Sequence, residues 1–327
     1  MQKPLEVTIT VGTSFSIGGA FTNPDTVRPV GDRAVYCDGH GLDFMLNTMN
    51  KHNISSSFFI ETANHNYFGD GPMGRIVEQI KKAGQDRQLL VHPCWFHYDK
   101  DSDYSRSDSC AERSYEELKK ILATSLETFE RWNGKRPQAI RAGNCMIDEQ
   151  FYKVVSELGI PLSSSLGLGI YIPHGKKFLI YRGRRKYGDV MEVPLFTYKD
   201  KDLMGGFPTK TLEIASCSKS EMRYILKKAR RDGVKNIVLL TQPFDYIKKR
   251  DDQYREITAN RVNKERLEDL CAFIAEHDQD FAAVNFSSKA DEWKDRELED
   301  VKRFRIPTRY RNGRKIENFI NDKFWNY

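Results

Sequence analysis

The densest group of residues able to do chemistry is His92, Cys94 and His97, which lie within six residues of one another. Imidazole and thiolate groups are good zinc ligands, so one interpretation is a divergent metal site. Four residues from neighbouring loops can complete such a site, namely Asp38, His40, Glu61 or Asp70. The simpler interpretation is a loop shaped by Pro93 and Trp95 around a buried, inert Cys94, with His97 on the surface.

Arg141 is the second residue that points to chemistry, because it ends a predicted strand at residues 138–141. A guanidinium group at such a position needs acceptors. We expect it to pair with Glu61 or Asp245, or to bind an anionic group of a ligand, such as a phosphate or a uronate carboxylate. The sequence identifies no complete catalytic set, and His92 and Arg141 are the candidates.

These residues lie in a chain that alternates between strand and helix patterns. Period-two alternation or short apolar runs predict strands over residues 5–11, 55–61, 88–92, 138–141, 162–165, 236–241 and 281–285, with another at 192–197. Apolar residues at helical spacing predict helices over residues 43–51, 73–83, 114–132, 148–159, 220–231 and 263–277. Repeated strand–helix units indicate parallel strands with crossover helices, hence a doubly wound sheet or a barrel.

In parallel α/β barrels the reactive residues follow the carboxyl ends of the strands. Applied to the predicted strands, this rule gives a candidate substrate pocket made of Gly12, Ser14, Glu61, His92, Cys94, Trp95, Arg141 and Gln242.

Composition excludes several classes of protein. The 327 residues are 39% hydrophobic and 30% charged, which is foldable and unlike a disordered or fibrous chain. No apolar run approaches the roughly 20 residues of a membrane span, and residues 1–10 lack a secretory pattern, so we expect a cytoplasmic protein. Six scattered cysteines without a Cys-x-x-Cys pair argue against disulfides. The net charge of +6 is not accompanied by a nucleic-acid-binding motif, so we expect no nucleic-acid partner. Oligomeric state is left open.

The compositional shift along the chain comes at its end. We expect one domain over residues 1–295 and a basic, aromatic extension over residues 296–327 that packs on it. Residues 301–316 carry seven basic residues and no acid, and residues 319–325 have the pattern of a short helix. A solvated strap is the simpler interpretation, and a patch for an anionic ligand or lipid headgroup is the alternative.

Several of these segments resemble the polysaccharide deacetylase (NodB-homology, carbohydrate esterase 4-like) family from about Val7 to Asn285. The similar segments are Thr8 to Phe21, Gly41 to Glu61, Ala83 to Trp95, Ile140-Arg-Ala-Gly143 and Val238 to Phe244. The resemblance implies a single-domain α/β fold, a distorted (β/α)7 barrel, that removes acetyl from an N-acetylated sugar. In that family a divalent metal held by one Asp and two His activates water, a carboxylate acts as base, a histidine as acid, and an arginine orients the base.

This sequence departs from the family pattern where the chemistry is done. Where the family's first motif has two acids, this sequence has Gly12, Thr13 and Ser14. Where the family has histidines in its later motifs, this sequence has Leu90, Cys94 and Gln242. His92 and Arg141 remain, and one histidine without carboxylates holds a hard divalent ion weakly.

Two hypotheses follow. The first is a deacetylase-like protein of surface-polysaccharide (O-antigen or capsule) biosynthesis that lacks the N-deacetylase activity and a cofactor. It would bind an N-acetylated sugar, a polysaccharide precursor or a partner. The alternative is a divergent N-deacetylase or amidase that uses zinc or another divalent metal with His92, Cys94, His97 and Arg141.

Overall fold

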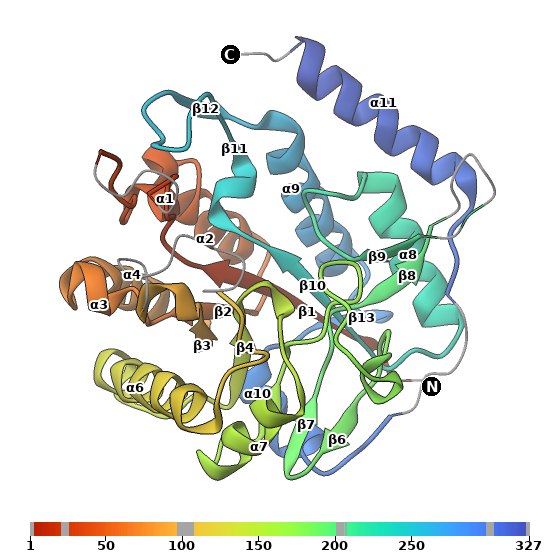
Figure 1. The fold of residues 1–327 in the computed structure, drawn as a ribbon. Coiled ribbons are helices and arrows are strands. Elements are labelled where there is room, and N and C mark those ends of the chain that lie inside the picture. Colours follow the sequence, from red (N-terminus) through yellow and green to blue (C-terminus); the bar gives the residue numbers. More distant parts are fainter. Residues whose placement is uncertain are drawn as a thin grey trace.

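The main sheet of the protein is formed by nine strands, most of them parallel. The computed structural model describes residues 3–20, 26–96, 108–200, 206, 208–298 and 304–324. The strands follow the order β10-β1-β2-β3-β4-β5-β7-β6, and β13 also pairs with β1 (Figure 1). Their bounds are β1 (Leu5–Thr13), β2 (Ser56–Glu61), β3 (Asp86–Val91), β4 (Ala139–Ala142), β5 (Leu162–Ser163), β6 (Arg185–Tyr187), β7 (Val190–Glu192), β10 (Asn236–Thr241) and β13 (Phe281–Ala283). Among the pairings of this sheet that involve described residues, only that of β6 with β7 is antiparallel.

The central strands are buried on both faces, and most of their residues are apolar or small, although β3 begins with the polar residues Asp86, Arg87 and Gln88. Every residue of β2, β3 and β10 is buried, and in β1 only Glu6 is partly exposed. Parallel strands in this position are covered by helices on the outside and by side chains inside. The register places Glu61 beside Leu90, and Leu90 beside Arg141, so the carboxyl ends of β2, β3 and β4 meet at one edge.

Helices surround the strands and connect them (Figure 1). The longer ones are α2 (Leu42–Lys51), α4 (Gly71–Lys82), α6 (Tyr115–Asn133), α7 (Glu149–Glu157), α8 (Lys219–Arg231), α9 (Arg261–Glu276), α10 (Phe286–Trp293) and α11 (Thr308–Phe324). Each of the six helices predicted from periodicity is present to within two residues at both ends. Ser114 caps α6 by accepting a hydrogen bond from the amide of Glu117.

The predicted strand at residues 192–197 is wrong as a single element. β7 ends at Glu192, an extended link follows, and β8 (Thr197–Lys199) pairs instead with β9 (Thr209–Thr211). Within this link the amide of Val193 donates to the carbonyl of Ser163, and the amide of Phe196 donates to the carbonyl of Val238. The link therefore forms hydrogen bonds with β5 near its start and with β10 near its end. The closure of the strands into a seven-stranded barrel stays a prediction.

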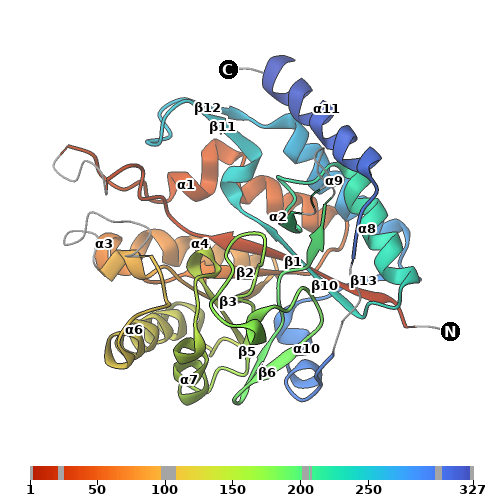
Figure 2. The same cartoon turned by 45° about the vertical axis from the view of Figure 1, so that its right-hand side comes forward.

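The C-terminal segment is more regular than its sequence indicated. The predicted helix at 319–325 is the end of α11, which begins at Thr308 and lies along α8 and α9 in two views (Figures 1 and 2). Ion pairs and a ring contact hold this helix in place. It therefore does not need the stripe of apolar residues by which a helix is predicted from its sequence. Arg314 pairs with Asp200 and Glu221, and the ring of Tyr310 stacks on that of Tyr224 at 4.4 Å between centroids.

Several short elements had no clear sequence signal. They are α1 (Arg33–Tyr36), α3 (His65–Phe68) and the hairpin of β11 (Ile247–Lys249) with β12 (Ile257–Ala259). All six cysteines are buried and free. No helix in the described part of the chain combines the length and the apolarity that a membrane span requires.

Candidate functional site

Two adjoining cavities lie where the parallel strands end. The larger has a volume of about 500 Å³, and its lining includes Ser14, Phe15, Trp95, Phe244, Lys249 and Tyr254. The smaller has a volume of about 160 Å³, and its lining includes Gly12, Leu90, Arg141, Cys145 and Glu213. His92, Asn144 and Gln242 line both, so the two cavities meet at these three side chains.

His92 is held at this junction by a buried carboxylate. Its Nδ1 lies 2.7 Å from Oδ2 of Asp108, whose side chain is fully buried. The same Oδ2 accepts a hydrogen bond from Nδ2 of Asn144 at 2.6 Å, and Oδ1 accepts one from the amide of Cys94 at 3.4 Å. Burial alone lowers the pKa of His92, but attraction by Asp108 and Glu61 outweighs it and raises the pKa above its usual 6.5.

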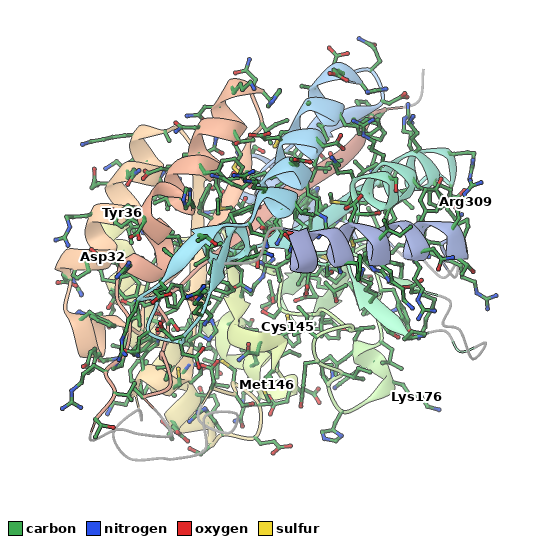
Figure 3. The ribbon with its side chains drawn as sticks, turned by 90° about the horizontal axis from the view of Figure 1, so that it is seen from above. Asp32, Tyr36, Cys145, Met146, Lys176 and Arg309 are labelled. Atoms are coloured by element: carbon green, nitrogen blue, oxygen red, sulfur yellow. The ribbon has the colours of Figure 1, made fainter. Side chains whose placement is uncertain are left out.

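The turn after β4 shapes the wall behind His92. A Cβ atom on Gly143 would lie 2.4 Å from Nδ1 of His92, so glycine allows the ring to pack against the backbone. The next two residues, Asn144 and Cys145, both have positive φ angles, of 52° and 58°. Positive φ angles at two consecutive non-glycine residues cost conformational free energy. The turn adopts this backbone conformation, in which Asn144 donates a hydrogen bond to Asp108. Figure 3 shows Cys145 near the middle of the molecule.

Arg141 reaches the smaller cavity but does not pair as expected. Its Nε donates to the carbonyl of Ser164 at 2.7 Å, Nη2 to Oγ of Ser164 at 2.8 Å, and Nη1 to Oγ1 of Thr10 at 3.0 Å. Its guanidinium lies 4.1 Å from the ring centre of Phe59. The expected pairing with Glu61 or Asp245 is therefore wrong, because neutral acceptors and an aromatic face satisfy the buried group. Burial lowers the pKa of Arg141 to about 10.

Glu61 is turned away from both cavities in the described structure. Its side chain is fully buried, and its two carboxylate oxygens lie 3.0 and 3.2 Å from the amide of Asn64. Burial raises the pKa of Glu61 to about 8, although His92 and the backbone amides oppose this shift. The expectation that Glu61 lines the pocket is corrected here, because its carboxyl closes the turn that follows β2.

Cys94 and Trp95 occupy the short helical turn at Pro93–Phe96. Burial, with the nearby Asp108, raises the pKa of the Cys94 thiol well above its usual 9.0. Trp95 lines the larger cavity yet is buried, with its ring against those of Phe68 and Tyr67. Tyr67 and Phe68 belong to the short helix α3, which thus packs on this tryptophan.

The described residues do not fit a metal centre. No group of three or more His, Cys, Asp or Glu side chains in the described part of the chain can hold an ion. His97 lies outside the described residues. The other proposed ligands are elsewhere: Asp38 pairs with Arg33, Asp70 pairs with Arg131, and His40 faces Lys264.

Gly12, Ser14 and Gln242 do line the cavities, at the ends of β1 and β10. The side chain of Gln242 lies over Gly12, where an added Cβ would be 3.5 Å from its Cγ. Gln242 also forms a reciprocal cap with Asp245, whose burial raises its pKa to about 7. Asp245 therefore serves the turn after β10.

Sequence reasoning missed Asp108, Asn144 and Glu213. Asn144 directly follows the recognised Ile-Arg-Ala-Gly segment, and its position alone was a usable signal. Asp108 follows no predicted strand, and Glu213 lies just after the short strand β9, which the sequence did not predict. Neither residue therefore had a usable signal in the sequence. Both reach the site through long-range folding.

No family model and no curated protein matches the sequence of this chain. Solved structures match its fold. A Mycobacterium smegmatis protein assigned as a polysaccharide deacetylase is 15% identical, with a TM-score of 0.55 over 92% of this chain and 96% of its own. A Pseudomonas aeruginosa protein with the same assignment is 9% identical, with a TM-score of 0.52 over 89% and 91%. The Puue allantoinase is 9% identical, with a TM-score of 0.52 over 89% and 90%. At such identities the likeness shows the fold alone, and the predicted polysaccharide deacetylase type of fold is confirmed.

Proposed function

We propose that this protein binds a carbohydrate in the larger cavity and lacks the metal-dependent N-deacetylase activity of the polysaccharide deacetylases whose fold it shares. The observation that carries the proposal is the chemistry of the strand ends. Among the described residues, the one imidazole there, that of His92, has its Nδ1 taken by Asp108. The nearby carboxyl of Glu61 is buried away from the cavity, and Cys94 is held as a neutral thiol by its raised pKa.

The larger cavity suits a hydroxylated ring. It combines polar side chains, such as Ser14 and Gln242, with the aromatic rings of Trp95 and Tyr254. Pockets of this volume hold ligands the size of a substituted sugar. Aromatic faces pack on the C–H surface of such a ring while polar groups bind its hydroxyls.

We infer that the ligand is an N-acetylated sugar or a polysaccharide precursor, and that the protein serves surface-polysaccharide biosynthesis in the cytoplasm. The fold shared with polysaccharide deacetylases supports this ligand class. An anionic ligand at the basic C-terminal segment belongs to the same proposal. Arg309 of that segment is exposed at the edge of the molecule, whereas Cys145 lies near the middle (Figure 3).

The test measures metal content, turnover and binding on the full chain. We expect less than stoichiometric zinc by mass spectrometry, no acetate release from N-acetylhexosamine oligomers, and binding of those oligomers by calorimetry. Ser14→Tyr, which places a bulky ring in the larger cavity, should abolish binding, whereas Glu127→Tyr on the exposed face of α6 should retain it. Stoichiometric zinc together with acetate release would overturn the proposal and support the divergent metal enzyme.

A further inference from the structure

The smaller cavity contains two side chains that can move protons. His92 follows β3 and Glu213 follows β9, and both contribute to its lining. Neither has been given a role by the binding proposal. A cavity of about 160 Å³ that is walled by a base and an acid fits a small group, such as an acyl substituent.

The His92 ring is fixed in one orientation. Asp108 accepts from Nδ1, which leaves Nε2 as the ring nitrogen able to meet a ligand in the cavities that His92 lines. A carboxylate in this position selects the tautomer and increases the basicity of the other nitrogen. Asn144 in turn holds Asp108, at the cost of a left-handed backbone. Strained residues that persist beside a cavity are typical of functional sites.

Glu213 is held on another wall of the cavity. Its backbone forms an isolated bridge with Leu240 of β10, so its position is tied to the sheet. Burial raises its pKa above the usual 4.5, against the opposing effects of Lys210 and the Ser216 hydroxyl. The raised pKa favours the protonated carboxyl, which is the form that donates a proton.

The other charged and titratable groups around the pair are known. Asp108 and Glu61 are the titratable neighbours of His92, and Cys94 lines the larger cavity with it. The guanidinium of Arg141 lines the smaller cavity with both His92 and Glu213. The titratable neighbours of Glu213 are Lys210, Asp245 and Cys145. The pair thus combines a base made stronger by carboxylates and an acid made weaker by burial, an arrangement that distinguishes acid from base in hydrolytic sites.

We propose that His92 and Glu213 form a metal-independent acid–base pair that hydrolyses an acyl ester on a sugar bound in the larger cavity. This inference rests on the proposed carbohydrate ligand and adds a reaction to it. An ester suits the site better than an amide, because an alkoxide is a better leaving group than an amide nitrogen and needs less activation of the carbonyl.

The reaction is balanced by the two residues and water. Nε2 of His92 takes a proton from water while the water oxygen bonds to the acyl carbon. The bond from the acyl carbon to the sugar oxygen then breaks, and that oxygen takes the proton of the Glu213 carboxyl. The products are a carboxylic acid and a free hydroxyl, and exchange with solvent returns the proton from His92 to Glu213.

The experiment compares two esters with different leaving groups in the presence of EDTA. Glucose pentaacetate releases an alkoxide that needs an acid, whereas 4-nitrophenyl acetate releases a stable phenolate that does not. We expect His92→Gln to lower both rates by about 100-fold, and Glu213→Gln to lower by about 10-fold only that of glucose pentaacetate. His174→Gln, at an exposed histidine, is the control and should keep both rates.

The pH profile separates catalysis from a structural role. The wild-type rate for glucose pentaacetate should rise and then fall with pH, and Glu213→Gln should remove the fall at high pH. Asp108→Asn removes the negative charge beside His92, so it should lower the pKa seen in the rising limb for 4-nitrophenyl acetate. Melting temperatures verify that each variant is folded.

Rates abolished by EDTA, or equal losses on both esters in Glu213→Gln, would overturn the inference. So would His92→Gln rates equal to those of His174→Gln. Ester hydrolysis without binding of N-acetylhexosamine oligomers would refute the proposed ligand alone. Binding of those oligomers without ester hydrolysis would refute the acid–base pair alone.

Discussion

Replacing Glu61 by glutamine should make the protein more stable at alkaline pH. Glu61 is fully buried, and burial raises its pKa from 4.5 to about 8. The folded protein therefore binds this proton more tightly than the unfolded chain. Its contribution to stability is complete below pH 4.5, declines as the pH rises towards 8, and is lost above that value. Glutamine has no proton to lose, so Glu61→Gln escapes this decline.

The magnitude follows from the two pKa values. A change from 4.5 to about 8 corresponds to about 5 kcal/mol at most, at about 1.4 kcal/mol for each pH unit. The amide oxygen of glutamine can still accept the hydrogen bond from Asn64, so the cost of the substitution at low pH is small. We expect the free energy of unfolding of Glu61→Gln, relative to wild type, to increase by about 2–5 kcal/mol between pH 5 and pH 9.

Urea unfolding followed by circular dichroism at pH 5, 7 and 9 measures this difference. Glu78→Gln, at an exposed glutamate on α4, is the matched control and should track the wild type. A difference between Glu61→Gln and wild type that stays constant over this range would refute the reasoning. Weaker sugar binding by Glu61→Gln would show instead that the carboxylate faces the ligand.

Two further substitutions test the buried cations. Arg141→Met should lower the free energy of unfolding by about 3 kcal/mol, because Ser164 loses its charged donors; a loss under about 1 kcal/mol in urea unfolding would contradict this. Arg314→Met should cost about 3–5 kcal/mol and speed tryptic cleavage within α11, because it removes the cation from the buried carboxylate of Asp200 and leaves Glu221 with Lys210, 3.7 Å away. The exposed Arg309→Met should stay within about 0.5 kcal/mol of wild type.

Much of the fold could be predicted because its signals are local. The period of apolar residues located six helices and seven strands to within two residues, since that period reflects which face each element buries. The rule that reactive groups follow parallel strands also placed Gly12, His92 and Gln242, which do line the cavities. Elements held by long-range ion pairs, such as α11, escaped because their sequences carry no apolar stripe.

The site itself could be predicted only in part. Strand ends indicate which residues reach the mouth of the sheet, but not the direction in which each side chain turns. Glu61 turns inward to bind Asn64, and Arg141 finds its acceptors on Ser164 and Thr10. Both outcomes depend on neighbours that lie on other elements of the chain.

By itself, the sequence determined the order of strands and helices and the location of His92 at a strand end. The tertiary structure decided that Asp108 and Asn144 hold this histidine and that Glu213 shares its cavity. The physical reason is that residue types and spacing determine local burial, whereas the partner of a buried polar group is chosen by whichever distant segment folds against it.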